Sequence, residues 1–201
     1  MNHKVNNVQQ LYIDSEKLYN DCVLKTADTL IDDLSQGINI LKGCWEGADA
    51  GIQIQNVIEV HNSLVFIRNI LAKLARDASS IASRYREIQN ANRANLENLP
   101  VISINEKQIM SEYSDTRDTI NITEEANNGK NKIDTANNNI DGFISEVKRY
   151  YNNIIDNWQM GQGREKAVEA FEDFLTKSNN YKNTLSDVSA SITDAIKNYS
   201  F

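Results

Sequence analysis

The sequence predicts an all-α fold, an elongated four-helix bundle made of two consecutive helical hairpins. The chain of 201 residues holds a single proline and only eight glycines, too few turn residues for a sheet protein of this length. Its apolar residues recur at intervals of three, four and seven, which is the spacing of amphipathic helices. The organisation also repeats, because each half contains a helix that ends in tryptophan, a glycine-containing turn and a second helix.

The first two predicted helices meet at Gly47. The first starts near Val8, carries its apolar residues on one face and ends at Trp45. The second resumes the same spacing after Gly47 and can continue to Leu99. Pro100 then stops it, because proline lacks an amide hydrogen and clashes with the preceding helical turn. The apolar stripe of the second helix consists of Val57, His61, Leu64, Ile67, Leu71, Leu74, Ala78, Ile81, Tyr85 and Ile88.

A third helix is expected directly after the proline. Ser103 and Glu106 have the spacing of a capping box, so this helix is predicted to begin near Ile104. The asparagine-rich stretch at 126–131 has poor helix propensity, which predicts a kink or a mobile turn, or else an asparagine-biased face in solvent. A second tryptophan turn at 158–163 leads into the last helix, which runs nearly to the end of the sequence.

These elements divide the chain into two hairpins. The first covers 1–99 with its turn at 45–49, the second covers 104–201, and residues 100–103 link them. A linker of this length reaches at most about 18 Å, whereas helices of ~40 residues are about 60 Å long. The sequence therefore favours an up-down-up-down topology, with both tryptophan turns at one end and a central hairpin of the second and third helices. If the asparagine stretch is a loop, an antiparallel arrangement of the hairpins becomes possible.

Composition and charge restrict the partners. The chain has 21 basic and 28 acidic residues and a net charge of −7, which argues against nucleic acid and anionic lipid. No run approaches the ~20 apolar residues of a membrane span. No apolar stretch near Met1 could serve as the core of a cleavable signal peptide, so any export is expected to proceed without one.

Residues that carry chemistry are few. His61 falls on the core stripe of the second helix, His3 lies at the N-terminus, and neither has a second ligand at metal spacing. Cys22 and Cys44 fall on one predicted helix about 33 Å apart, too far for a disulfide, and are expected to be small buried apolar residues, with a reactive thiol as the alternative. We therefore expect no enzymatic activity, no cofactor and no metal.

The first turn has residues suited to a tight bend. Gly47 follows the last stripe residue and can adopt the left-handed conformation that ends a helix. Asp49 is placed to cap the next helix by accepting from its free amides. Trp45 can close the core of the hairpin or insert between the ends of two other helices. A tryptophan before a helix-ending glycine can equally well seal any helical hairpin.

Trp45, Glu46 and Gly47, with roughly 40 helical residues on either side, resemble the motif of the WXG family of small helical hairpins, the ESAT-like proteins of type VII secretion. Trp158 and Gly161 resemble a degenerate copy of the motif with one extra residue between them. The two copies cover residues 5–98 and 104–199. The chain therefore looks like a tandem form of the family.

The resemblance implies a non-enzymatic protein that is exported folded, or that escorts a toxin to the secretion ATPase. It implies a helix-mediated contact with another helical hairpin protein, a secreted toxin or that ATPase, with a homodimer possible and no role for nucleic acid or a membrane span. Trp45, Gly47, Trp158 and Gly161 are the candidate partner-binding and turn residues. The alternative is a cytoplasmic four-helix adaptor, chaperone or toxin-neutralising protein.

Overall fold

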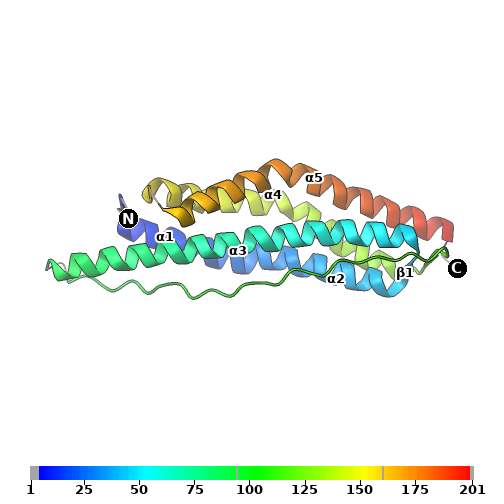
Figure 1. Cartoon of the computed structure of the whole chain (residues 1–201), viewed down its shortest axis with the longest axis horizontal. Coiled ribbons are helices and arrows are strands. Elements are labelled where there is room, and N and C mark those ends of the chain that lie inside the picture. The colour runs from blue at the N-terminus through cyan, green and yellow to red at the C-terminus, as the bar shows by residue number, and fades with distance from the viewer. Residues whose placement is uncertain (1–4, 94, 160, 200–201) are drawn as a thin grey trace. The chain divides into compact units, whose positions relative to one another are not determined.

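The computed structural model describes residues 5–93, 95–159 and 161–199, and it confirms the all-α class. The helices and strands of this part of the chain are shown in Figure 1. Their bounds are α1 Val8–Lys17, the π-helix η1 Leu18–Ala27, α2 Asp28–Cys44, β1 Trp45–Glu46, α3 Ala48–Ala91, β2 Asn121–Ile122, α4 Ala126–Asn157 and α5 Gln162–Tyr199. Among these helices, none combines the length and the apolar character that crossing a membrane requires.

The chain forms two compact units that do not coincide with the two predicted hairpins. Unit 1 contains Met1–Ala27, Ile67–Lys107 and Gly142–Asp173, and unit 2 contains Asp28–Phe66, Gln108–Asp141 and Phe174–Phe201. Each unit therefore takes residues from both sides of the predicted linker. The Trp158 turn belongs to unit 1, and the Trp45 turn belongs to unit 2.

The first helix runs without interruption from Val8 to Cys44, as predicted, but its middle is π-helical. The buried residues of η1 are Leu18, Tyr19, Cys22, Val23 and Ala27, and among them Leu18, Val23 and Ala27 follow at intervals of five and four, which matches the wider turn of a π-helix. Both cysteines are buried and free, as expected. The apolar pattern gave no signal for the π-helix, because a stripe at intervals of three and four is equally compatible with an α-helix.

The second helix ends eight residues earlier than predicted, at Ala91 instead of Leu99. The backbone then leaves helical geometry, since Arg93 has a φ of 81° and Asn95 a φ of 41°. The side chain of Asn90 accepts from the amide of Leu96 and donates to its carbonyl. The Asn90 side chain thus takes the place of the backbone groups to which Leu96 would bond in a continued helix. The helix therefore ends before it reaches Pro100.

The prediction of a third helix beginning near Ile104 is wrong. Residues 95–120, here called the strap, contain no helix, and in each unit they run extended beside α3 (Figure 1). In unit 1 the side-chain amide of Asn69 pairs with both backbone polar groups of Lys107. Side chains of α3 thus satisfy the strap's backbone, and the capping-box spacing at Ser103 has no helix to cap.

The register of the strap on α3 follows from simple geometry. Gln55, Asn62 and Asn69 lie seven residues apart on α3, and they bind backbone groups of Tyr113, Met110 and Lys107, which lie three residues apart. Seven helical residues rise about 10.5 Å, and three extended residues span about 10 Å. The two repeats therefore stay in step along the helix.

The asparagine-rich stretch begins α4, so the predicted kink or mobile turn at 126–131 is also wrong. In unit 2 a Cβ added at Gly129 would lie 3.0 Å from the Leu41 side chain, and one added at Gly37 would lie 3.1 Å from the Gly129 carbonyl. The absence of side chains lets α2 and α4 approach closely here. Tertiary packing thus overrides the weak helix propensity of the asparagines.

The remaining apolar stripes confirm the predicted core faces. The stripe of α4 is buried at Ile133, Ala136, Ile140, Phe143, Val147, Tyr150 and Ile154. That of α5 is buried at Ala167, Phe171, Phe174, Leu185, Val188 and Ile192, whereas its other predicted members, Tyr181, Ala195 and Tyr199, are only partly buried or exposed. On α3 the predicted stripe is buried from Val57 to Ile81, but Ile88 is exposed near the helix end.

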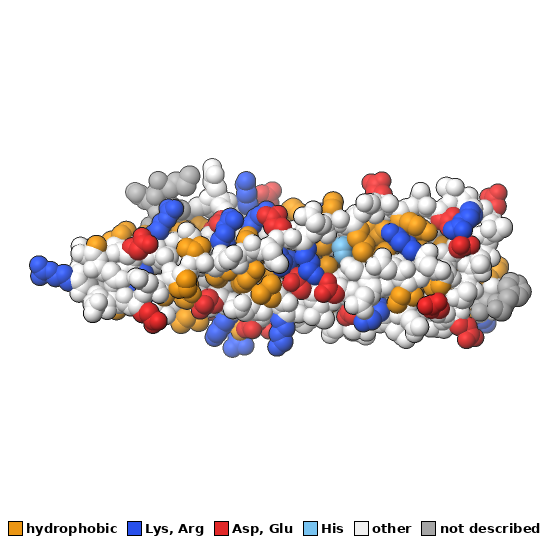
Figure 2. Space-filling view, turned by 90° about the horizontal axis from the view of Figure 1, so that it is seen from below, with side chains coloured by type: hydrophobic (Ala, Val, Ile, Leu, Met, Phe, Trp, Pro, Cys, Tyr) orange, Lys and Arg blue, Asp and Glu red, His pale blue; other side chains and the backbone are white. Residues whose placement is uncertain are grey.

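The predicted central hairpin of the second and third helices is wrong, because the strap replaces the linker at 100–103. In unit 2, β2 pairs with β1, so the start of α4 lies beside the turn between α2 and α3. In unit 1, Val5 pairs with Trp158, so the end of α4 lies beside the start of α1. On the face shown in Figure 2, acidic and basic side chains are interspersed with apolar ones.

Candidate functional site

The Trp45 turn joins α2 to α3 in unit 2. Trp45 is only 2% exposed, and Gly47 has a φ of 118°, the left-handed conformation expected of it. A Cβ at Gly47 would lie 2.7 Å from the carbonyl oxygen of Thr119. Glycine is therefore required both for the backbone conformation and for the close approach of the chain that precedes β2.

Strand β2, which is not part of this hairpin, pairs with the two turn residues of β1. Trp45 pairs with Ile122 and Glu46 with Asn121 in an antiparallel ladder. The amide of Thr123 donates to the carbonyl of Cys44 at 3.1 Å, next to this ladder. A segment distant in sequence is thus hydrogen-bonded across the end of the hairpin.

The end of the strap also caps α3. Asp115 accepts from the amide of Gly47 at 3.0 Å, and the carbonyl of Arg117 accepts from the amide of Ala48 at 3.1 Å. The predicted cap, Asp49, lies inside the first turn of α3 instead. The strap therefore supplies two acceptors at a helix N-terminus, where free amides and the helix dipole favour them.

The strap's cap is held by a small ionic cluster. The Arg117 guanidinium lies 2.6 Å from the Asp115 carboxylate and 2.8 Å from that of Glu46. Hydrogen bonds hold the pKa of Asp115 well below its usual range. The bond from the Arg117 side chain has the larger effect and the bond from the Gly47 amide the smaller one. Because the Asp115 side chain is 4% exposed, its negative charge depends on these donors.

The Trp158 turn joins α4 to α5 in unit 1. Trp158 is 2% exposed, and Gly161 has a φ of 153°. Val5 pairs with Trp158 in an antiparallel bridge, and the amide of Asn6 donates to the carbonyl of Asn157 at 3.1 Å. The chain just before α1 is therefore hydrogen-bonded across this second turn.

Both turns have the same local construction. In each, a β-branched residue shortly before a helix pairs with the tryptophan, and the amide of the next residue donates to the carbonyl just before that tryptophan. The residues before the helices are Val5 and Ile122, which sequence reasoning missed. A signal existed, since each is a β-branched residue that follows an asparagine-containing or polar stretch and lies three or four positions before the first residue of a helix.

The predicted site residues fall in two different units. Trp45 with Gly47 lies in unit 2 and Trp158 with Gly161 lies in unit 1, and both rings are buried. The expectation that the two tryptophans form one apolar end stays a prediction. What each turn can do is fix the ends of two helices and the segment that crosses them.

His61 is buried and hydrogen-bonded within unit 2. His61 is 2% exposed, with its Nε2 lying 2.9 Å from the Ser35 hydroxyl and its Nδ1 3.0 Å from the Asn62 amide oxygen. In the part of the chain that the structure describes, no three His, Cys, Asp or Glu side chains gather as metal ligands would. Comparison with family models, with curated proteins and with solved structures gave no match for this chain.

Proposed function

We propose that this chain is a tandem WXG-like protein of a type VII secretion system, which presents helical surfaces to a protein partner and catalyses no reaction. The observation that carries the proposal is the repeated turn: a buried tryptophan, a glycine at positive φ and a short antiparallel pairing with a segment before a long helix. The same turn construction occurs in both helical hairpins of the chain. This repetition supports the resemblance based on Trp45, Glu46 and Gly47.

The tryptophans act indirectly in this proposal. Trp45 and Trp158 are each 2% exposed, so a partner cannot grip them without rearranging the turn. Together with Gly47 and Gly161 they set where each helix ends. Binding to another helical hairpin protein, a toxin or the secretion ATPase would then use the exposed faces of those helices.

Export is the direct test of this function. The protein should be found in the culture medium of wild-type cells and not in the medium of cells that lack the type VII ATPase. A cytoplasmic marker enzyme measured in the same samples controls for lysis. Retention inside both strains would contradict the proposal and favour the intracellular adaptor, chaperone or toxin-neutralising protein.

Replacing Trp45 tests the role of the turn. Removing a buried tryptophan side chain costs about 3–5 kcal/mol, so helicity has to be measured beside export. With Trp45→Ala we expect export or partner binding to be lost while circular dichroism retains most of the helical signal. Val57→Ala, a fully buried position of α3 in the same unit, is the control for core damage alone. Loss of the whole fold on Trp45→Ala would reduce the residue to a core position.

A further inference from the structure

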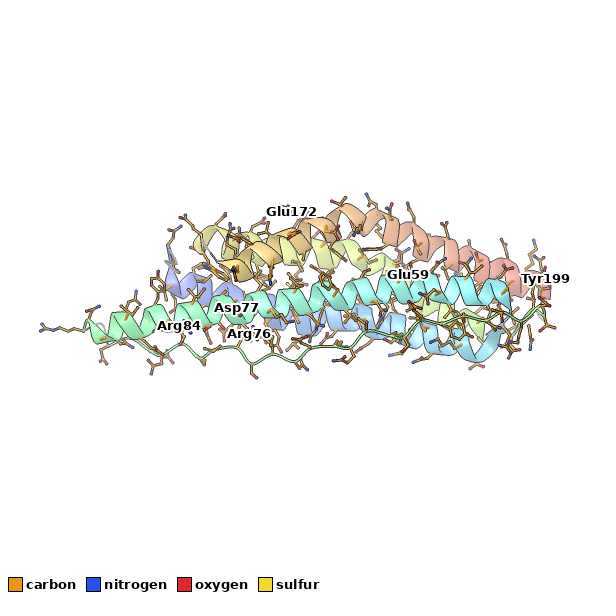
Figure 3. The ribbon with its side chains drawn as sticks, viewed as in Figure 1. Glu59, Arg76, Asp77, Arg84, Glu172 and Tyr199 are labelled. Carbon is orange, nitrogen blue, oxygen red and sulfur yellow. The ribbon has the colours of Figure 1, made fainter. Side chains whose placement is uncertain are left out.

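A cavity of about 320 Å³ lies in unit 2, between the start of α3 and the end of α5. Trp45, Asp49 and Gln53 line one side of it, and Asp194, Asn198 and Tyr199 line the other. Tyr199 is labelled at the end of α5 in Figure 3. The volume is at the small end of the ~300–1,000 Å³ typical of ligand pockets, which fits one side chain better than a cofactor.

The cavity is acidic, and Trp45 on its lining has an unsatisfied donor. In the described part of the chain, neither Asp49 nor Asp194 forms an ion pair. Trp45 is only 2% exposed, and its Nε1 has no hydrogen-bond partner. The two carboxylates without an ion pair favour a cationic occupant over an apolar one.

A second cavity, of about 240 Å³, lies between the same two helices in unit 2. It is lined by Asn56 and Glu59 of α3 and by Thr184 and Asp187 of α5, among others. Glu59 is labelled on α3 in Figure 3. Among the described residues, this cavity is again lined by two carboxylates and no basic side chain, so both cavities favour a positively charged occupant.

The spacing of the two cavities matches the spacing of residues two turns apart on a partner helix. Asp187 and Asp194 lie seven residues apart on α5, which is a rise of about 10.5 Å or two helical turns. On α3, Ile52 and Phe66 are 59% and 57% exposed, and each lies seven residues from Glu59. A partner helix with basic residues two turns apart and apolar residues beside them would match both features.

Resting on the proposed function, we propose that the surface between α3 and α5 of unit 2 binds a basic helix of a protein partner, with one arginine in each cavity. Arginine suits the first cavity because its flat guanidinium can pair with carboxylates and stack on the ring of Tyr199, which is 42% exposed. The net charge of −7 attracts such a helix from a distance.

The probe is an alanine-based helical peptide carrying two arginines two turns apart. The matched control peptide has citrulline, which is neutral and of nearly the same shape, at both positions. Binding is followed by the indole N–H resonance of Trp45 in NMR spectra, with the resonance of Trp158 in unit 1 as internal control. We expect the arginine peptide to shift the Trp45 resonance and leave Trp158 unchanged, and the citrulline peptide to shift neither.

Charge-neutralising variants locate the peptide. Asp194→Asn and Glu59→Gln should each weaken the arginine peptide by about tenfold, as expected when one partner of a close charge pair is removed. Glu112→Gln removes the same charge from an exposed position of the strap in unit 2 and should leave the affinity unchanged. Higher salt should weaken binding to the unmodified protein.

Equal binding of the citrulline peptide would overturn the inference, as would equal effects of Glu112→Gln and Asp194→Asn. Binding of spermidine at least as tight as that of the peptide would also overturn it, because the surface would then select charge without a helix. These outcomes are separate from export. ATPase-dependent export without peptide binding refutes only this inference, and peptide binding by a protein that is not exported refutes only the proposed function.

Discussion

At the scale of single residues, the Trp45 turn depends on one residue without a side chain, Gly47, and on one charged residue, Asp115. Gly47 is fixed by a positive φ and by the Thr119 carbonyl beside its Cα. Asp115 is fixed by the Gly47 amide and the Arg117 guanidinium. Thr119 and Asp115 both belong to the strap, so each contact can be tested without changing the tryptophan.

Gly47→Ala should destabilise the protein. The alanine would have to hold a φ of 118° with its Cβ about 2.7 Å from a backbone oxygen, and we expect a loss of about 2 kcal/mol or more. The control is Gly43→Ala, where the added Cβ meets nothing within 4 Å and the helix gains up to about 1 kcal/mol. Unfolding in urea measures both, and equal stabilities of the two variants would contradict the constraint at Gly47.

Asp115 should make stability depend on acidity. Its pKa is lowered from 3.8 in the folded protein, so its contribution is present above that value and is lost as the pH falls through the folded pKa. The unfolding free energy should therefore drop between about pH 5 and about pH 2 more steeply in the wild type than in Asp115→Asn. Urea unfolding across this range gives both slopes, and parallel slopes would show that Asp115 adds nothing.

At the scale of elements, the strap is the feature that departs most from an ordinary helical bundle. A long extended segment leaves backbone amides and carbonyls without internal partners. Here α3 provides them through asparagine and glutamine side chains spaced at heptad intervals. The strap is thus attached to a helix in the manner of a strand added to a sheet edge, with side-chain amides in place of the neighbouring strand.

Asn62→Ala should loosen the strap locally. The variant removes the 2.8 Å bond from the Met110 amide and the 2.9 Å bond to the Met110 carbonyl. With about 1 kcal/mol lost per bond, exchange of the Met110 amide hydrogen should be roughly tenfold faster or more. Asn56→Ala on the same helix changes the same residue type away from the strap bonds. If the two variants gave the same exchange rate at Met110, the Asn62 contact would have no role in holding the strap.

At the scale of the whole molecule, each compact unit is assembled from three separate stretches of the chain. Every unit includes residues from both tryptophan-containing halves, and each half ends or begins inside the strap. A helical hairpin taken alone would expose the apolar stripe that the other half covers. The two halves are therefore expected to depend on each other for folding.

Fragments 1–99 and 104–201 test this dependence. Each alone should show low helicity and no cooperative unfolding, because the buried faces of its helices have no cover. Mixing the two should restore helicity and a cooperative transition. The intact chain under identical conditions is the reference. Cooperative unfolding of either fragment alone would show that the hairpin is the folding unit.

The apolar spacing of the sequence predicted the all-α class, the core faces of the long helices and the burial of the cysteines and His61. The position of Gly47 after the last stripe residue predicted its left-handed conformation. Neither pattern could determine where α3 stops or that Ser103 starts no helix, because local propensity does not register Asn62 and Asn69, which bind the strap's backbone. The start of α4 among asparagines depends on a close contact between Gly37 and Gly129. These features were decided by tertiary contacts, since hydrogen bonds and packing between distant residues outweigh preferences of a few tenths of a kcal/mol per residue.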